Sequence, residues 1–326
     1  MSDVVDTEPL IRYSDEVREA LARRDPVVAL ESNVVAHGFR RPQNVAVARE
    51  VEAVVRAGGA VPATIFLADG RIVVGATDAE LEKLGSAPDV AKVTSRDIAV
   101  TLARKALGAT SIAATMAIAH RAGIATVASA GLGGVHRDAP TSMDISADLT
   151  ELARTRLIVV CAGVKKILDA GLTLEFLETQ GTPVIGYRHR GFPAFYCRDS
   201  GFDTQARVDD PGEIAGIARL HQQLNTGSIL VTHPIPVADA LDGDRIEAAV
   251  QQALARAAAE RVTGPAVTTF VLRAVDAATG GDAAAANRAV LLSTTRAATE
   301  IEVARSAAER AARDRPIHTR EVSHAS

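Results

Sequence analysis

Two adjacent lysines, Lys165 and Lys166, follow an apolar run in the segment LIVVCAGVKKILDAG. We predict that a buried strand ends at Ala162-Gly163 and that a helix begins at Lys165. Partial burial and the positive end of a helix would both lower the pKa of Lys165. The neutral amine could then form a Schiff base with a carbonyl compound. Spacing alone also allows the commoner case, in which both lysines are solvated at the surface.

Two carboxylates lie downstream of a glycine-rich stretch, in SAGLGGVHRDAPTSMDISADL. If a helix starts near Met143, then Asp144 and Asp148 lie on one face of it, with Ser146 between them. Such oxygen ligands suit Mg²⁺ or Mn²⁺, with water at the remaining positions. In the alternative, Asp144 only caps a helix N-terminus. The glycines do not form a dinucleotide fingerprint, because the strand-to-helix GxGxxG context is absent.

Other segments carry groups that could bind a phosphate or move a proton. Thr110 and Ser111 begin an amphipathic helix whose free N–H groups could bind an anion, although any Ser-capped helix has this pattern. Lys92 could add positive charge there or simply be solvated. Glu31 follows the first strand in ALESNVVAHG. It could act as a general acid if apolar neighbours raise its pKa, or it could face water.

The elements that must position these residues alternate between strand and helix, which predicts a layered α/β domain. Residues 26–30 (PVVAL) form the first expected strand, and Asp69-Gly70 joins two strands in a hairpin, so the sheet is expected to be mixed. Helices are expected over 43–57, over 246–257 and from Gly280-Gly281 to about Arg313. Further strands are expected over 90–94, 124–128, 157–161, 183–186 and 228–232.

Composition limits the classes of protein that fit. The 326 residues are 47% hydrophobic, which is compatible with a single domain over 1–326, and we expect flexible tails at about 1–20 and 314–326. A net charge of -4 does not favour nucleic acid as a partner. The two cysteines have no disulfide-framework or zinc-type spacing. With no apolar run of membrane length and no signal-peptide pattern at the N-terminus, we expect a cytoplasmic protein without membrane contact.

An ordered series of segments carries a resemblance from about Val27 to about Glu300. The series is ALESNVVAHG, RPQNVAVAREVE, GAVPATI, AKVTSRD, GATSIAATM, GLGGVHRDAP, MDISADL, VVCAGVKKILD, LTLEFLE, TPVIGY and FPAFYCRDSGF. In this order the segments resemble the pseudouridine-5′-phosphate glycosidase family, also called indigoidine-synthase-A-like proteins. The resemblance implies a three-layer α/β/α sandwich around a mixed β-sheet, a homotrimer and bound Mn²⁺ (or Mg²⁺).

The resemblance also implies roles for individual residues. Lys165 matches the covalent lysine, Glu31 the proton donor and Asp144 the metal-binding aspartate. Asp148 and Lys92 are expected to move protons as well as to contact substrate. The other positions that match substrate-contacting or pocket residues are Ile112, Ser146, Ala147, His136 and Asn287. With Thr110 and Ser111, these residues form the expected site for ribose 5-phosphate.

Several positions depart from the usual wording of the family motifs. These departures are Asn33, Ala36, Ser95, Ala130, Asp138, His233, Thr268, Thr269, Ser293 and Thr294. We interpret them as altered polar lining around the group that the ribose is joined to. The sequence therefore predicts a C-glycosynthase that joins ribose 5-phosphate to an aromatic polyketide such as prealnumycin, in antibiotic biosynthesis. The alternatives are a pseudouridine-5′-phosphate glycosidase and a non-catalytic sugar-phosphate-binding protein. A kinase is not supported, because no GxxxxGK[ST] loop occurs.

Overall fold

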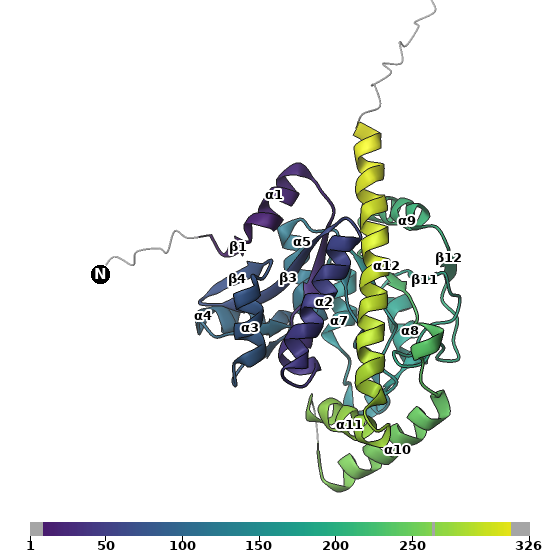
Figure 1. Cartoon of the computed structure of the whole chain (residues 1–326). Coiled ribbons are helices and arrows are strands. Elements are labelled where there is room, and N and C mark those ends of the chain that lie inside the picture. Colours follow the sequence, from purple (N-terminus) through teal and green to yellow (C-terminus); the bar gives the residue numbers. More distant parts are fainter. Residues whose placement is uncertain (1–8, 263–264, 314–326) are drawn as a thin grey trace, which may run out of the picture.

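The computed structural model describes residues 9–262 and 265–313, and a mixed sheet of eleven strands lies at the centre of this part of the chain (Figure 1). The strands lie in the order β1 (Ile11–Tyr13), β4 (Arg71–Val74), β3 (Val61–Ala68), β2 (Val27–Glu31), β7 (Thr126–Ala128), β9 (Ile158–Cys161), β13 (Ile229–Thr232), β11 (Val184–Tyr187) and β12 (Ala206–Val208). The two remaining strands, β5 (Ala91–Val93) and β6 (Gly108–Thr110), pair with each other, and β6 also pairs with β3.

The sheet is mostly parallel, with β3 antiparallel to β4 and to β6. The predicted hairpin joins β3 to β4, and both residues of its turn have left-handed backbone, with φ of 53° at Asp69 and 79° at Gly70. Such a turn matches the twist of the strands it joins, which is why Asp-Gly predicts it well. The prediction of a mixed sheet is confirmed.

Helices cover both faces of the sheet and complete the α/β/α sandwich that the resemblance implied. On one face, α12 (Asp282–Arg313) crosses β2, β7 and β9 and packs against α2 (Gln43–Ala57) and α9 (Pro211–Leu224). On the other face lie α5 (Ile112–Ala122) and α7 (Ala147–Arg154), which pack against each other. The helices α10 (Gly243–Ala259) and α11 (Pro265–Ala278) form a pair beside the first residues of α12 (Figure 1).

The remaining elements are short and connect these layers. The helices are α1 (Asp15–Arg23), α3 (Asp78–Ser86), α4 (Ile98–Ala103), α6 (Ala139–Ser142) and α8 (Ala170–Thr179), with single turns η1 (Val34–Gly38), η2 (Ser95–Asp97) and η3 (Val237–Asp239). A separate antiparallel ribbon pairs β8 (Val135–His136) with β10 (Leu168–Asp169). Since β8 and β10 have two residues each, no alternating pattern could predict them.

The expected N-terminal tail is shorter than predicted. Ile11–Tyr13 pairs with β4, and α1 begins at Asp15 with Ser14 as its N-cap. Val17 and Ala20 are fully buried, and this apolar contact explains why the segment is ordered despite its polar composition. The prediction of a flexible tail is therefore wrong for residues 11–20, whereas residues 1–8 and 314–326 lie outside the described residues. The single domain over 1–326 stays a prediction.

Candidate functional site

The sheet has a topological switch point between β2 and β7. From β2 the chain crosses to β3 on one side, and from β7 it crosses to β9 on the other. In open α/β sheets, ligands bind beyond the carboxyl ends of the strands at such a point. Glu31 is the last residue of β2, and Ser129 follows β7 directly. The Ser129 hydroxyl donates a hydrogen bond to Oε1 of Glu31 across this point.

Burial controls the protonation of Glu31. Loss of solvent raises the pKa of this carboxyl to about 7, against the opposing effects of the Ser129 hydrogen bond and the positive charge of Lys165. Lys92 also lowers this pKa and Asp148 raises it, and the same two residues act on the pKa of Lys165. The structure therefore brings Glu31, Lys165, Asp148 and Lys92 together, and near neutral pH Glu31 can both hold and release a proton.

Lys165 lies in irregular backbone and not at the start of a helix. After β9 the chain turns at Gly163, which has φ +67°, and α8 begins only at Ala170. A Cβ at Gly163 would lie 1.9 Å from the carbonyl oxygen of Pro193, so only glycine fits this turn. The prediction of a helix N-terminus at Lys165 is wrong. Burial, and not a helix terminus, is the main cause that lowers the pKa of the Lys165 ammonium, and the positive charge of Lys92 lowers it further.

Asp148 is held by two backbone N–H groups. Its Oδ1 accepts from Ala113 N at 2.9 Å, and its Oδ2 accepts from Gly133 N at 2.8 Å. A Cβ at Gly133 would lie 2.7 Å from Asp148 Oδ2 and 2.3 Å from Ser146 Oγ. Gly133 therefore permits a close approach of backbone to carboxylate, which fixes Asp148 in one orientation.

The predicted helix from Met143 does not form. Met143 has left-handed backbone and ends α6, whereas α7 begins at Ala147 with Ser146 as its N-cap. Asp144 therefore precedes the helix and does not share a helical face with Asp148. Met143 adopts φ 56°, a conformation that stops a helix and that a hydrophobic pattern does not reveal.

Asp144 faces His136 and solvent. The backbone N of His136 donates to the Asp144 carbonyl at 3.0 Å, and His136 Nε2 lies 3.7 Å from Asp144 Oδ2. The Asp144 side chain is 47% exposed. In residues 9–262 and 265–313, no group of three His, Cys, Asp or Glu side chains is arranged to hold a metal ion. A hard cation that keeps several waters and takes one carboxylate still fits Asp144, with His136 beside it.

The start of α5 presents the expected phosphate-binding residues. Ser111 is the N-cap, yet its side chain makes no capping bond, and its buried Oγ has no hydrogen-bond partner in the described part of the chain. Thr110 differs, because its hydroxyl donates to the Ile65 carbonyl at 2.7 Å and accepts from Thr115 at 2.9 Å. The structure thus places the Thr110 side chain in the core, and Ser111 is the hydroxyl available to a ligand.

The other expected site residues have few contacts that indicate a role in the site. Ser146 accepts from Asp148 N at 3.2 Å, and Ala147 is exposed in the first turn of α7. Ile112 is 4% exposed at the start of α5, and Lys92 is exposed in β5. Asn287 is partly buried in α12. Within the described residues, no hydrogen bond joins Asn287 to the other site residues, so its role stays a prediction.

Ser129 and Gly133 act in the site but were not singled out from the sequence. Ser129 bonds to Glu31, and Gly133 gives its N–H to Asp148. The signal for Ser129 was its position directly after a buried strand, where polar side chains commonly face a ligand. Gly133 had no signal of its own among the neighbouring glycines.

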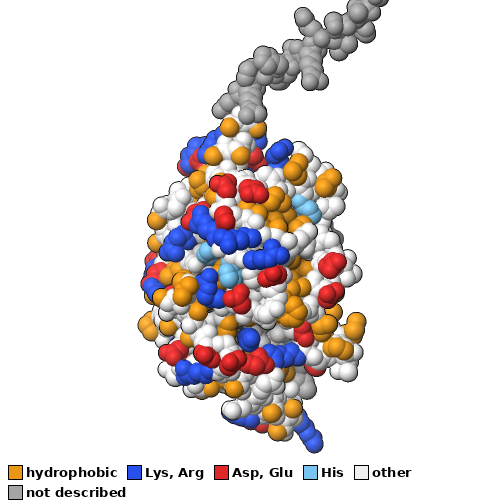
Figure 2. All heavy atoms as spheres, turned by 90° about the vertical axis from the view of Figure 1, so that its right-hand side faces the viewer, with side chains coloured by type: hydrophobic (Ala, Val, Ile, Leu, Met, Phe, Trp, Pro, Cys, Tyr) orange, Lys and Arg blue, Asp and Glu red, His pale blue; other side chains and the backbone are white. Residues whose placement is uncertain are grey.

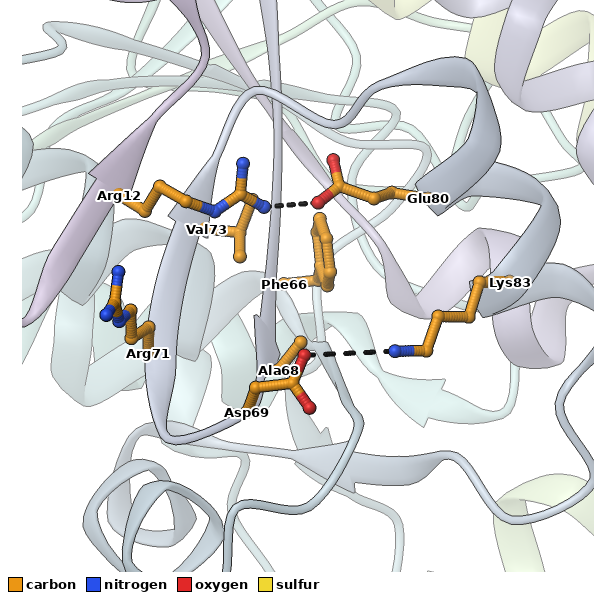
Figure 3. Close-up of a pocket in the computed structure, with 8 residues that line it drawn as sticks. All are labelled: Arg12, Phe66, Ala68, Asp69, Arg71, Val73, Glu80 and Lys83. Carbon is orange, nitrogen blue, oxygen red and sulfur yellow. Dashed lines mark hydrogen bonds and ion pairs between the residues drawn. The ribbon is translucent and has the colours of Figure 1, made fainter.

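A pocket of about 260 Å³ lies elsewhere, between β1, the β3–β4 hairpin and α3 (Figure 3). Its charged side chains pair across it, Arg12 with Glu80 and Lys83 with Asp69 at 3.8 Å. None of the expected site residues lines it. This pocket is therefore a charged surface feature separate from the switch point.

Basic and acidic side chains are interspersed on the face of the molecule shown in Figure 2. Exposed ion pairs of the described residues include Arg190–Asp203 and Arg207–Asp209. No helix within residues 9–262 and 265–313 combines the length and apolar composition that crossing a membrane requires.

The α/β/α sandwich, with a buried amine and a protonatable carboxyl at its switch point, defines this chain as one of the layered α/β enzymes. The sequence profile of the family described as indigoidine synthase A like protein matches residues 16–304. The chain belongs to this family. It is an enzyme of the pseudouridine-5′-phosphate glycosidase type.

Individual relatives agree with this assignment. A pseudouridine-5′-phosphate glycosidase from Dickeya dadantii is 51% identical over 295 residues, which cover 90% of this chain and 93% of that protein. The crystal structure of the prealnumycin C-glycosynthase AlnA in complex with ribulose 5-phosphate is similar with a TM-score of 0.88 and 43% identity, covering 93% of this chain and 99% of that one. An indigoidine synthase A-like protein from Thermotoga maritima is similar with a TM-score of 0.82 and 31% identity, covering 91% and 97%.

Proposed function

We propose that this enzyme makes or breaks a carbon–carbon bond between C1 of ribose 5-phosphate and a ring carbon, through a Schiff base on Lys165. The observation that carries the proposal is the paired shift of two acid–base groups. Burial lowers the pKa of the Lys165 amine and raises the pKa of Glu31 to about 7, and the two groups interact electrostatically. A neutral nucleophile beside a protonated acid is the combination that imine formation needs.

The proposed chemistry explains why a lysine is required. A C-glycosidic bond lacks the oxygen leaving group that ordinary glycosidases protonate. When Glu31 protonates the ring oxygen, the sugar opens, and C1 can condense with the Lys165 amine, with loss of water. The resulting iminium accepts electrons. In synthesis, a ring carbon attacks C1 of this iminium, and the sugar hydroxyl then closes the ring on C1 and displaces the lysine. In cleavage, the amine first adds to C1 as the sugar ring opens, and the ring carbon then leaves with its bonding electrons and takes up a proton as the iminium forms. Asp148 and Lys92 would move the protons of these steps, and Asp148 is already oriented by its two backbone donors.

The start of α5 is proposed to bind the phosphate. The unpartnered Ser111 Oγ and the N–H groups of the first helical turn, apart from that of Ala113, which donates to Asp148, would form this anion site. Lys92 adds positive charge, as its interactions with Glu31 and Lys165 indicate. Ribose 5-phosphate would then lie between this anion site and Lys165.

Sequence identity favours uracil as the ring that is joined to the sugar. The Dickeya dadantii protein, named for pseudouridine 5′-phosphate, is 51% identical, whereas the C-glycosynthase AlnA is 43% identical. We therefore place the pseudouridine-5′-phosphate glycosidase activity first. The aromatic polyketide acceptor is the second candidate.

Among the departures from the family motifs, Asn33 leaves a polar atom available to an acceptor near Glu31, whereas His233, Ser293 and Thr294 have contacts within the fold. Asn33 lies just beyond Glu31, and its buried Oδ1 has no hydrogen-bond partner among the described residues. His233 follows β13, and its Nδ1 lies 3.3 Å from the Tyr187 carbonyl. Ser293 is buried in α12, and the Thr294 hydroxyl bonds to carbonyls of its own helix. Ser293 and Thr294 are therefore explained by packing within the fold.

A single assay separates the two acceptors. Incubation with Mn²⁺, ribose 5-phosphate and uracil is expected to yield pseudouridine 5′-phosphate, detected by chromatography and mass. Prealnumycin under the same conditions is the comparison. Product from prealnumycin and none from uracil would contradict the uracil assignment while leaving the Lys165 chemistry intact.

We also propose that Asp144 binds Mn²⁺ or Mg²⁺, with water at the other positions. The bound ion would orient water and the sugar oxygens next to the acid–base residues. The open carboxylate of Asp144 beside His136 supports this choice. The homotrimer, which the family resemblance implies, and the cytoplasmic location, which the sequence composition led us to expect, stay predictions.

Replacing Asp144 with alanine is expected to weaken Mn²⁺ binding by at least about 10-fold, because the only proposed protein ligand is lost. Titration of Mn²⁺ followed by its electron paramagnetic resonance signal measures this directly, without turnover. Asp138→Ala, which removes an exposed carboxylate nearby, serves as the control and should bind Mn²⁺ as the wild type does. Equal affinity of Asp144→Ala and wild type would rule out Asp144 as the ligand.

A further inference from the structure

Arg137 joins three segments around the site. It follows His136 of the β8–β10 ribbon, and its side chain is 27% exposed. Its Nη2 donates to the carbonyl oxygen of Lys166 at 2.6 Å. Its Nη1 and Nη2 also donate to Oε1 and Oε2 of Glu247 in α10, at 2.6 and 2.9 Å. One guanidinium thus bonds both to the peptide beside Lys165 and to a helix that is distant in sequence.

Glu247 holds the guanidinium in a fixed orientation. The two-point contact between a carboxylate and a guanidinium is strong and directional. Gln251 Nε2 donates to Glu247 Oε1 at 2.9 Å, and Lys166 Nζ lies 4.0 Å from Oε2. The hydrogen bond from Arg137 is the main cause that lowers the pKa of Glu247 to about 2. Glu247 therefore stays ionised throughout the neutral range and remains a charged acceptor for Arg137.

The backbone at Lys165 needs such external support. Lys165 belongs neither to a strand nor to a helix, so no regular hydrogen-bond ladder fixes it. The Lys165 carbonyl accepts from Leu168 N at 2.8 Å, and the Gly163 carbonyl accepts from Leu132 N at 2.8 Å. Arg137 holds the next carbonyl, that of Lys166. The direction in which the Lys165 side chain leaves the backbone depends on these bonds, and small misplacements of a nucleophile are costly.

We propose that Arg137 is a positioning residue, which fixes the Lys165–Lys166 turn and is itself braced by Glu247 of α10. This proposal rests on the proposed role of Lys165 as the nucleophile. It predicts that loss of the bridge slows formation of the covalent adduct and leaves the affinity for ribose 5-phosphate unchanged, because no atom of Arg137 needs to touch the sugar. It also links the placement of α10 to the reactivity of Lys165.

The test measures the rate at which borohydride traps ribose 5-phosphate on the protein, as a function of sugar concentration. Arg137→Ala is expected to lower the limiting rate by about 100-fold, the size of effect that a misplaced reacting group produces. The half-saturating sugar concentration should stay within twofold of the wild-type value. Arg137→Lys keeps the positive charge and can still donate a hydrogen bond to one of the two partners. Its trapping rate should therefore be higher than that of Arg137→Ala. Glu247→Gln should fall between the wild type and Arg137→Ala.

Arg207→Ala is the matched control. Arg207 is an exposed arginine of β12 that also forms an ion pair, with Asp209 at 2.9 Å. Its trapping rate should equal that of the wild type. If Arg137→Ala does not fold, Glu247→Gln decides: slower trapping with unchanged half-saturation supports the bridge, and a wild-type rate overturns it. Wild-type rates in both Arg137→Ala and Glu247→Gln would also overturn it. Absence of any adduct in the wild type would instead contradict the proposed function.

Discussion

Lys165→Ala is expected to lower kcat by at least about 10⁴-fold, because a covalent nucleophile cannot be replaced by binding alone. Without the amine, no iminium forms at C1, and the carbon–carbon bond has no electron sink. The fold should persist, since removal of the buried Lys165 amine relieves the cost of desolvating this group. The measurement combines turnover of pseudouridine 5′-phosphate with borohydride trapping and circular dichroism.

Lys83→Ala controls for the loss of a lysine as such. Lys83 has a side chain that is 58% exposed, pairs with Asp69 at 3.8 Å and lines a pocket that contains none of the expected site residues. Its turnover should match the wild type. Binding of ribose 5-phosphate by Lys165→Ala is measured as a rise in Tm when the sugar is added. Such a rise would show that the variant has lost the chemical step and not the affinity for the sugar. Turnover in Lys165→Ala within 10-fold of the wild type would remove Lys165 from the mechanism.

Glu31→Gln is expected to lower turnover by about 10²- to 10⁴-fold and to change the shape of the pH profile, because glutamine cannot donate the proton. In the wild type, activity should rise with pH as Lys165 becomes neutral and fall above about pH 7 as Glu31 loses its proton. The fall near pH 7 should be absent from the residual activity of Glu31→Gln. Steady-state rates measured across the pH range test this directly.

Glu52→Gln is the matched control for Glu31→Gln. Glu52 is also a buried carboxyl whose pKa is raised, chiefly by burial, but it bonds to Thr64 at 2.7 Å and lies outside the site. Its pH profile should keep the fall near pH 7. If the activity of Glu31→Gln still falls near pH 7, then a group other than Glu31 causes that fall.

Glu31→Gln is also expected to stabilise the folded protein at neutral pH, although it lowers the turnover. The folded-state pKa of Glu31 is above its ordinary value, so the folded state loses stability as pH rises from about 4.5 through about 7. Glutamine does not ionise and avoids this loss. The Tm of Glu31→Gln relative to the wild type should therefore increase between about pH 5 and about pH 8.

The sequence predicted the fold where a local pattern determines the element. The helix over 43–57 is α2 with the same bounds, and the predicted hairpin at Asp69-Gly70 joins β3 to β4. Pattern reasoning failed where tertiary contacts determine the backbone. Nothing near Lys165 in the sequence shows that Gly163 must turn against the Pro193 carbonyl, which delays the next helix to Ala170.

The same limit applies to the residues of the candidate site. Lys165 and Glu31 were identifiable because each ends or follows a buried strand, and the structure brings both to the switch point. Thr110 was expected to face the ligand beside Ser111, but its hydroxyl bonds to the Ile65 carbonyl, a partner that only the β3–β6 pairing brings near. Arg137 had no local signal, because its partner Glu247 is 110 positions away in the chain.

The most direct test of the account is to locate the trapped sugar. The wild-type protein, incubated with ribose 5-phosphate and Mn²⁺ and then reduced with borohydride, should carry one pentose phosphate on the peptide that contains Lys165, as read by tandem mass spectrometry. No added pentose phosphate, or attachment to Lys92 or another side chain, would contradict the proposed Schiff base on Lys165.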